Sequence, residues 1–241
     1  MGRHHDASDS CPSGSDGLTN PDGLVYSLDL RAPRACVSCA SGALYERVAD
    51  PGSRMKLLPP SVSPIGLLLR SLGTGRAGLS PAFGESLAEA ASVCLDERGH
   101  SSPTELSLSG AYDATADLGW DAPTGQQKRC WNDDEEATEQ GAYGIASLLV
   151  EQCGLEVVQR SKKKTGFDFW LGEIGGDRRL FQGLSRLEVS GIRDGSDAAV
   201  KSRVKSKMTQ TETSDVLGLP AVVVVVEFGA PRARMVERCL R

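Results

Sequence analysis

The chain has 241 residues, of which 39% are hydrophobic and 24% charged, which is enough to form a substantial core. Its formal net charge of −5 argues against a uniformly basic nucleic-acid-binding protein, although a local basic patch would still attract a polyanion. No apolar run approaches the roughly 20 residues of a membrane span, and the polar N-terminus does not resemble a secretory signal. Because the seven cysteines are scattered, we expect reduced thiols in a cytoplasmic protein that makes no contact with membranes.

The first half of the chain divides into two segments of different composition. Residues 1–43 are rich in Ser, Gly, Asp and Pro, and we expect them to be largely disordered. Residues 44–132 are more apolar and predict a small α+β extension of unknown role. Its expected elements are a helix over 80–97, which starts at a Ser-Pro pair, and strands over 102–110 and 114–120. Neither segment contains a pattern that we interpret as a catalytic site.

The second half, residues 133–241, predicts a separate domain of alternating helices and strands. In order, these are a helix over 133–152, a strand over 155–160, a β-hairpin over 165–192, a helix over 196–210 and a buried strand over 221–228. A helix that crosses over to a buried strand predicts a mixed sheet with helices on both faces. The expected fold class is therefore α/β.

Each apolar run of the hairpin contains one carboxylate, Asp168 in the first and Glu188 in the second. A carboxylate in such a run is costly unless a positive group satisfies it. Since adjacent strands lie about 4.8 Å apart, two carboxylates on one sheet face can share a hard divalent cation. Glu139, beside the buried face of the preceding helix, is a third candidate. The alternative is a surface position for Asp168 and an ion pair between Glu188 and Arg186 or Arg193.

Basic residues crowd the segment around these carboxylates, where acidic residues are fewer. This distribution suits a phosphate backbone, and a lysine near the cation can stabilise charge on a phosphate. The other interpretation is an ordinary solvated basic surface. The basic residues are Lys162, Lys163, Lys164, Arg178, Arg179, Arg193, Lys201, Arg203, Lys205 and Lys207.

Four short motifs follow one another between residues 133 and 228. They are Glu139 in its helix, the strand LEVVQR, Gly166-Phe-Asp168 and Leu187-Glu188-Val189-Ser190. This part of the chain resembles the PD-(D/E)XK nuclease superfamily, and most closely the core of Holliday-junction resolvases and restriction endonucleases. The resemblance implies a restriction-endonuclease-like α-β-β-β-α-β core. It also implies a Mg²⁺ or Mn²⁺ site assembled by Glu139, Asp168 and Glu188, with the Val189 carbonyl as a further ligand.

One position departs from the family. Its motif lysine, two residues after the glutamate, is Ser190 in this chain. A serine hydroxyl can donate a hydrogen bond but brings no positive charge. Some family members supply the lysine from the following helix, and Lys201 and Lys205 are the corresponding catalytic candidates here. If neither reaches the site, the domain would bind nucleic acid without cutting it.

The resemblance implies a metal-dependent nuclease, a hydrolase of DNA phosphodiester bonds, in prokaryotic defence or DNA processing. Two alternatives stay open. One is a catalytically inactive nuclease-like module that binds nucleic acid or a protein partner. The other is a structural protein whose N-terminal region contacts a partner, for which residues 44–132 are the expected surface. Cutting of both DNA strands would favour a homodimer.

Overall fold

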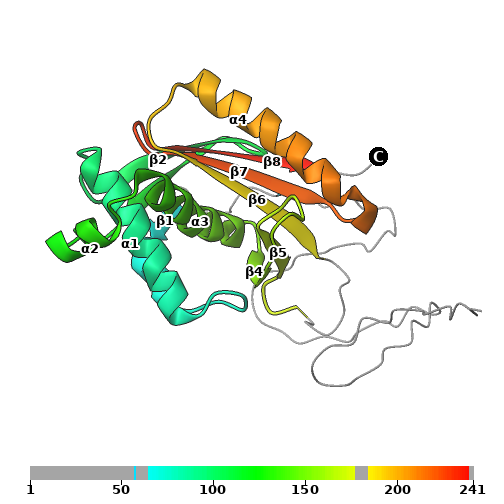
Figure 1. Ribbon diagram of the computed structural model, residues 1–241, viewed down its shortest axis with the longest axis horizontal. Coiled ribbons are helices and arrows are strands. Elements are labelled where there is room, and N and C mark those ends of the chain that lie inside the picture. The colour runs from blue at the N-terminus through cyan, green and yellow to red at the C-terminus, as the bar shows by residue number, and fades with distance from the viewer. Residues whose placement is uncertain (1–56, 58–64, 177–183, 239–241) are drawn as a thin grey trace, which may run out of the picture. The chain divides into compact units, whose positions relative to one another are not determined.

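The computed structural model describes Leu57 and residues 65–176 and 184–238 (Figure 1). The expected disorder of residues 1–43 and the basic residues Arg178 and Arg179 fall outside this part of the chain. The first half contributes β1 (Ile65–Leu68), the 3-10 helix η1 (Leu69–Thr74), α1 (Pro81–Glu97), β2 (Thr104–Gly110), β3 (Ala114–Gly119) and α2 (Gly125–Cys130). The second half contributes α3 (Asp134–Gln152), β4 (Leu155–Arg160), β5 (Phe169–Glu173), β6 (Ser185–Ile192), α4 (Asp197–Gln210), the 3-10 helix η2 (Thr211–Leu217), β7 (Ala221–Glu227) and β8 (Arg232–Arg238).

All eight strands of the described chain join one mixed sheet in the order β1-β3-β2-β8-β7-β6-β5-β4. The pairs β1–β3, β2–β8 and β6–β7 are parallel, and the other neighbouring pairs are antiparallel. The α/β class expected from the sequence is therefore confirmed. β2 and β3, the two strands expected in an extension, continue the same sheet because β2 pairs with β8.

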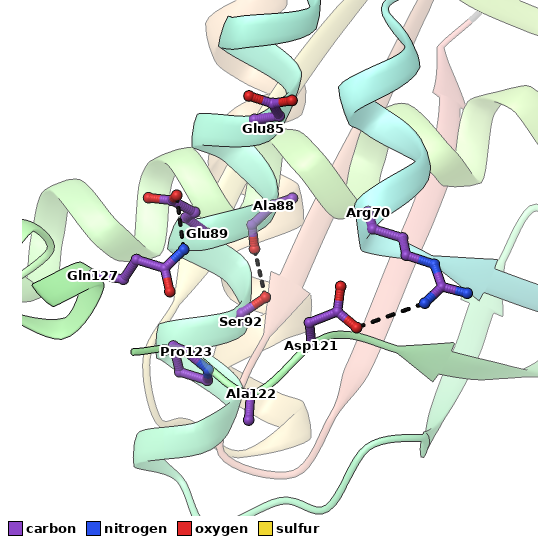
Figure 2. A pocket seen from close by; sticks show the side chains of 9 residues that line it. All are labelled: Arg70, Glu85, Ala88, Glu89, Ser92, Asp121, Ala122, Pro123 and Gln127. Atoms are coloured by element: carbon purple, nitrogen blue, oxygen red, sulfur yellow. Dashed lines mark hydrogen bonds and ion pairs between the residues drawn. The ribbon is translucent and has the colours of Figure 1, made fainter. Parts of the chain in front are cut away.

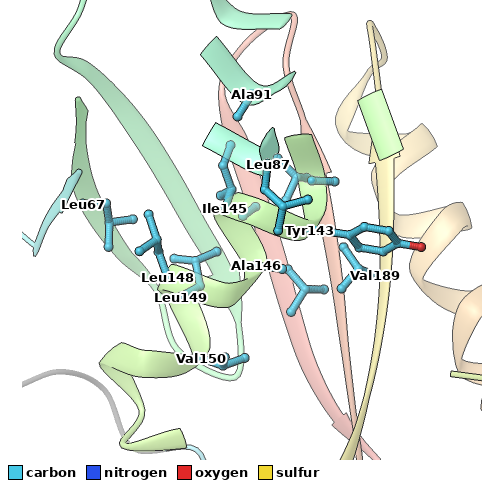
Figure 3. Close-up of a cluster of buried hydrophobic side chains, with 14 of the residues drawn as sticks. Leu67, Leu87, Ala91, Tyr143, Ile145, Ala146, Leu148, Leu149, Val150 and Val189 are labelled. Atoms are coloured by element: carbon cyan, nitrogen blue, oxygen red, sulfur yellow. The ribbon is translucent and has the colours of Figure 1, made fainter. Parts of the chain in front are cut away.

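Helices cover both faces of this sheet. α1 and α3 pack on one face, and α4 packs on the other (Figure 1). The cluster on the first face contains leucines and alanines of both helices (Figure 3). On the second face, Val200 and Val204 of α4 pack against Val223 and Val225 of β7. Because β7 is covered on both sides, all seven of its residues are buried, as its continuous apolar run predicted.

The two helices that carry the candidate site begin at capping residues, Asp133 before α3 and Ser196 before α4. Asp133 accepts hydrogen bonds from the N–H groups of Glu135 and Glu136 at the start of α3. Ser196 accepts one from the N–H of Ala199 at the start of α4. Such caps satisfy donors that have no partner within the helix, and so they fix its first turn.

Some elements differ from the expectation. β1, α2 and β8 were not predicted; β8 reads RARMVER, and its arginines obscure the alternation that buries Ala233 and Met235. Within the expected hairpin over 165–192, β5 ends at Glu173 and β6 begins at Ser185, and residues 177–183 between them lie outside the described part of the chain. Asp168 lies one residue before β5 rather than inside the strand. It therefore stands at the point where β5 begins to separate from β6.

Candidate active site

Asp168 and Glu188 lie on the same side of the sheet. β5 and β6 are antiparallel, and Phe169 lies opposite Leu187 at the end of their pairing. Continued by one residue, that register places Asp168 opposite Glu188. The Asp168 N–H donates to the Leu187 carbonyl oxygen (2.8 Å), and the Val189 N–H donates to Asp168 Oδ2 (2.8 Å). In this arrangement the two carboxyl groups interact directly with each other.

Glu188 is fully buried, and only one of its carboxyl oxygens has a donor. Lys207 Nζ donates to Oε1 (2.5 Å), whereas Oε2 has no hydrogen-bond partner in the described chain. Burial, reinforced by the Asp168 charge and opposed by Lys207, raises the pKa of Glu188 to about 7. Burial also raises the pKa of Asp168, against the hydrogen bonds from Val189 and Tyr143. Lys207 supplies one positive charge to these two carboxyl groups, and a proton or a further cation can supply the second.

Tyr143 connects the helix carboxylate to this pair. It follows Glu139 by one turn of α3, and its hydroxyl lies 2.6 Å from Glu139 Oε1 and 3.1 Å from Asp168 Oδ1. The ring packs edge-on against Phe169. Figure 3 shows it extending from α3 toward the strand of Val189, with the hydroxyl at its far end. One hydroxyl proton can be donated to only one of these two carboxylates at a time.

α4 supplies two cations to the same face of β6. Besides its contact with Glu188, Lys207 Nζ donates to Gln210 Oε1 (3.1 Å). One turn earlier, Arg203 donates to the hydroxyl of Ser190 (2.8 Å). Ser190 lies two residues after Glu188 and so shares its face of the strand. A cation from α4 therefore lies beside Ser190, the position at which the family resemblance led us to expect a lysine.

Lys201 and Lys205, the lysines expected to take over the catalytic role, do not contact the carboxylates. Lys201 forms an exposed ion pair within its own helix (2.6 Å), and Lys205 is exposed. Lys207, expected only to bind nucleic acid, is the lysine that reaches the pair. It follows Val200 and Val204 at helical spacing, and those valines face the sheet. That spacing is the signal in the sequence that could have identified it.

Two cavities meet at the carboxylates and together form a groove. The α4 half, of about 600 Å³, is lined by Glu188, Arg203 and Lys207 among others. The loop half, of about 490 Å³, is lined by Arg160 and by the basic loop of residues 162–164. The residues common to both halves are Glu139, Tyr143, Asp168 and Gln210. Glu139, although exposed, therefore lies in the middle of the groove.

The remaining arginines near the hairpin are paired elsewhere. Arg193 lines the α4 half but forms ion pairs with acids of α1 and α3. Arg186 is fully buried, and its guanidinium donates to groups within residues 211–219. The alternative in which Glu188 pairs with Arg186 or Arg193 is therefore wrong.

A third cavity, of about 270 Å³, lies against α1 and shares no residue with the groove (Figure 2). Arg70 and Asp121 form an ion pair across it (3.6 Å), and Gln127 donates to Glu89 (2.8 Å). These polar groups satisfy one another, so this cavity offers no evident chemistry.

Comparison with protein-family models, curated proteins and solved structures found no match to this chain. Among the residues that the structure describes, no three His, Cys, Asp or Glu side chains form a group able to hold a metal ion. The acidic centre of the groove is instead the Asp168–Glu188 pair, with Glu139 on the other side of the Tyr143 hydroxyl. No helix within residues 65–176 or 184–238 has both the length and the apolar character needed to cross a membrane.

The pKa of Glu188 predicts how stability depends on pH. It rises from 4.5 to about 7 on folding, so its contribution to stability is complete below pH 4.5 and is lost as the pH rises to 7. Glutamine does not titrate. As the pH rises from 4.5 to 8, the unfolding free energy of Glu188→Gln should therefore increase by about 1–3 kcal/mol relative to that of the wild type. Urea unfolding at several pH values measures this difference, with the exposed Glu105→Gln as the control. A difference independent of pH would contradict the expectation.

Proposed function

We propose that the chain is a divalent-metal-dependent nuclease that hydrolyses DNA phosphodiester bonds on a restriction-endonuclease-like core of the PD-(D/E)XK type. The observation that carries this proposal is the buried Asp168–Glu188 pair, in which Glu188 Oε2 has no donor in the described chain. A buried acceptor without a donor is costly, and a cation between the two carboxylates would satisfy it. An all-oxygen donor set suits Mg²⁺ or Mn²⁺.

Each residue of the groove has a chemical role in this proposal. Asp168 and Glu188 would hold the cation, with the Val189 carbonyl as a further ligand. When bound, a divalent cation polarises a phosphate oxygen and neutralises the negative charge that develops during hydrolysis. Lys207 takes the part of the family's lysine, because its ammonium lies beside Glu188 and can stabilise charge on the phosphate. Glu139 faces the groove and can orient the attacking water.

The order of elements supports the same core. α3, β4, β5, β6, α4 and β7 follow one another as α-β-β-β-α-β, which is the order that the resemblance implies. β5 pairs antiparallel with β6, and α4 crosses over to the parallel strand β7. β8, β2, β3 and β1 extend the sheet beyond β7.

Positive side chains on both sides of the carboxylates support a polyanionic substrate. Arg203 and Lys207 lie in the α4 half, and Arg160 with the lysines of residues 162–164 lies in the loop half. The α4 half also contains acids beside the carboxylate pair, including Asp134, Glu135 and Asp194, so basic side chains outnumber acidic ones in the loop half alone. A strand lying along the groove would have its phosphates near these cations and one phosphate at the carboxylate pair. A role in prokaryotic defence or DNA processing rests on the family resemblance alone.

One contact favours a second candidate function. The Lys207 ammonium lies 2.5 Å from Glu188 Oε1 and compensates part of the charge that a metal would compensate. In a catalytically inactive nuclease-like module, this ion pair would take the place of the metal. Such a module would bind nucleic acid or a protein partner through the groove without cutting.

Incubation of the full-length protein with supercoiled, linear and single-stranded DNA, and with RNA, separates the two functions. We expect cleavage products from DNA in Mg²⁺ or Mn²⁺ and none in EDTA. Salt-dependent binding without products in either metal would support the inactive module. If neither binding nor products were found, both proposals would fail.

Divalent cations should also stabilise the folded protein when no nucleic acid is present. A cation held by Asp168 and Glu188 binds only the folded state, so a concentration about 100-fold above Kd should add about 2.7 kcal/mol. Thermal unfolding in MgCl₂, MnCl₂ or EDTA at pH 8 and constant ionic strength measures the effect. Glu188→Gln should abolish it, whereas Glu105→Gln on β2 should retain it. A full effect in Glu188→Gln would place the cation elsewhere.

A further inference from the structure

Arg160, the last residue of β4, lies among three aromatic rings beside the carboxylates. Its guanidinium carbon is 5.5 Å from the ring centroid of Phe83, 5.6 Å from that of Tyr143 and 5.8 Å from that of Phe169. Aromatic faces attract a guanidinium through cation–π interactions and so restrict where it lies. The rings come from α1, α3 and β5, so Arg160 is positioned by the elements that also hold the groove together.

The guanidinium donors of Arg160 form no hydrogen bond within the described chain. No carboxylate there forms an ion pair with it, and no acceptor there takes a hydrogen bond from its guanidinium. Other arginines of the groove differ, since Arg193 is paired with acids and Arg203 donates to Ser190. A guanidinium that is held in place but has no protein acceptor is available to bind an anion from outside.

The loop after Arg160 forms a basic wall tied to the carboxylate pair. The three lysines of residues 162–164 line the same half of the groove. Lys164 has a φ of 75°, a left-handed conformation that a non-glycine residue keeps only when its surroundings enforce it. The Ser161 N–H donates to the Asp168 carbonyl oxygen (2.7 Å), which joins the start of the loop to the site. These features fix the backbone at the start of the loop, while the three lysine side chains are exposed along the loop half of the groove.

We propose that Arg160 binds a phosphate group of the substrate strand, adjacent to the phosphate that lies at the Asp168–Glu188 pair. This inference rests on the proposed nuclease function and adds the contact that positions the strand. A guanidinium can bind two phosphate oxygens at once, so it fixes orientation as well as adding affinity. Arg160 and Asp168 line the same half of the groove, so one strand can reach both. The group bound is either an internal phosphodiester or a terminal phosphate monoester.

Binding of fluorescein-labelled oligonucleotides to the full-length protein tests this inference without any cleavage. All variants carry Asp168→Asn and are measured in EDTA over a series of salt concentrations. Arg160→Gln should weaken binding about tenfold and lower the magnitude of the salt slope by about 0.7 for single strands or 0.9 for duplexes. Arg129→Gln is the matched control, because Arg129 is exposed on α2 and lines neither half of the groove.

Two further arms sharpen the result. Arg160→Lys keeps the positive charge but loses the planar guanidinium, so it should keep the salt slope and still bind more weakly. If thermal unfolding shows that Arg160→Gln is unfolded, Arg160→Lys takes its place as the test. An effect confined to 5′-phosphorylated oligonucleotides identifies a terminal phosphate, and an equal effect on 5′-hydroxyl ones identifies an internal phosphate. Unchanged affinity and salt slope in Arg160→Gln would overturn the inference. Failure of the wild-type protein, with Asp168 intact, to cut DNA in Mg²⁺ would instead overturn only the nuclease proposal.

Discussion

Replacing Asp168 with asparagine, or Glu188 with glutamine, is expected to reduce DNA cleavage by about 10³-fold or more. Each change removes one negative charge from the buried pair and puts an amide, a poor ligand for Mg²⁺, in place of a carboxylate of the same size. Alanine at either position should have the same effect. The measurement is the single-turnover rate of DNA cleavage in Mg²⁺, with the protein in excess over DNA.

Asp117→Asn and Glu105→Gln are the matched controls for these changes. Both acids are exposed, and they lie opposite each other in the β2–β3 pair, away from the groove. They should cleave DNA at the wild-type rate. Thermal unfolding separates loss of chemistry from loss of fold, and Glu188→Gln should unfold no earlier than wild type at pH 8 in EDTA because it removes a buried charge. Intact cleavage by Asp168→Asn would refute the assignment of the site.

Replacing Lys207 with methionine is expected to reduce cleavage by about 10²- to 10³-fold. Methionine keeps most of the aliphatic stem but removes the ammonium beside Glu188. Lys205→Met and Lys201→Met are matched controls on the same helix, and both should retain wild-type cleavage because their side chains do not contact the carboxylates. The same single-turnover assay compares all three variants. If Lys205→Met were the impaired variant, α4 would have to be rotated relative to the structure described above.

The Lys207 substitution should also affect stability. Without its ammonium, Glu188 loses its one described hydrogen-bond donor, so the unfolding free energy at pH 8 should fall by about 1–3 kcal/mol. Urea unfolding measures this loss. Lys207→Arg keeps the charge and should recover stability more fully than cleavage, because a guanidinium directs its donors differently. Full cleavage by Lys207→Met would mean that the lysine serves only to pair with Glu188.

Local signals in the sequence explain which elements could be predicted. α1, α3 and α4 begin at residues whose side chains cap them, and β7 is a continuous run of valines. These signals depend only on residues close together in the chain. β1 has four residues, and four of the seven residues of β8 are charged, so neither shows an apolar pattern long enough to recognise. The joining of β2 to β8 depends on two segments more than 100 residues apart, and no local pattern reports it.

The identity of the α4 lysine that contacts Glu188 likewise depended on the tertiary structure as well as on the local sequence. The spacing of Val200, Val204 and Lys207 contains the information that they share a helix face. It becomes informative once it is known that this face packs on β7. Without that knowledge, Lys201 and Lys205 are equally good candidates. They are also nearer in sequence to Ser190, the position at which the family resemblance implies a lysine.

The sequence by itself determined the α/β class, two carboxylates in neighbouring β-forming segments, a surplus of basic residues around those two, and a third carboxylate in the helix before them. Each of these follows from residue type and order along a short stretch of chain. Only the tertiary structure decided that Lys207 reaches Glu188, that Tyr143 bridges Glu139 and Asp168, and that the exposed Arg160 lies near three aromatic rings. Those contacts join residues from separate helices and strands, and they exist only because packing the apolar faces sets how each element is rotated and placed.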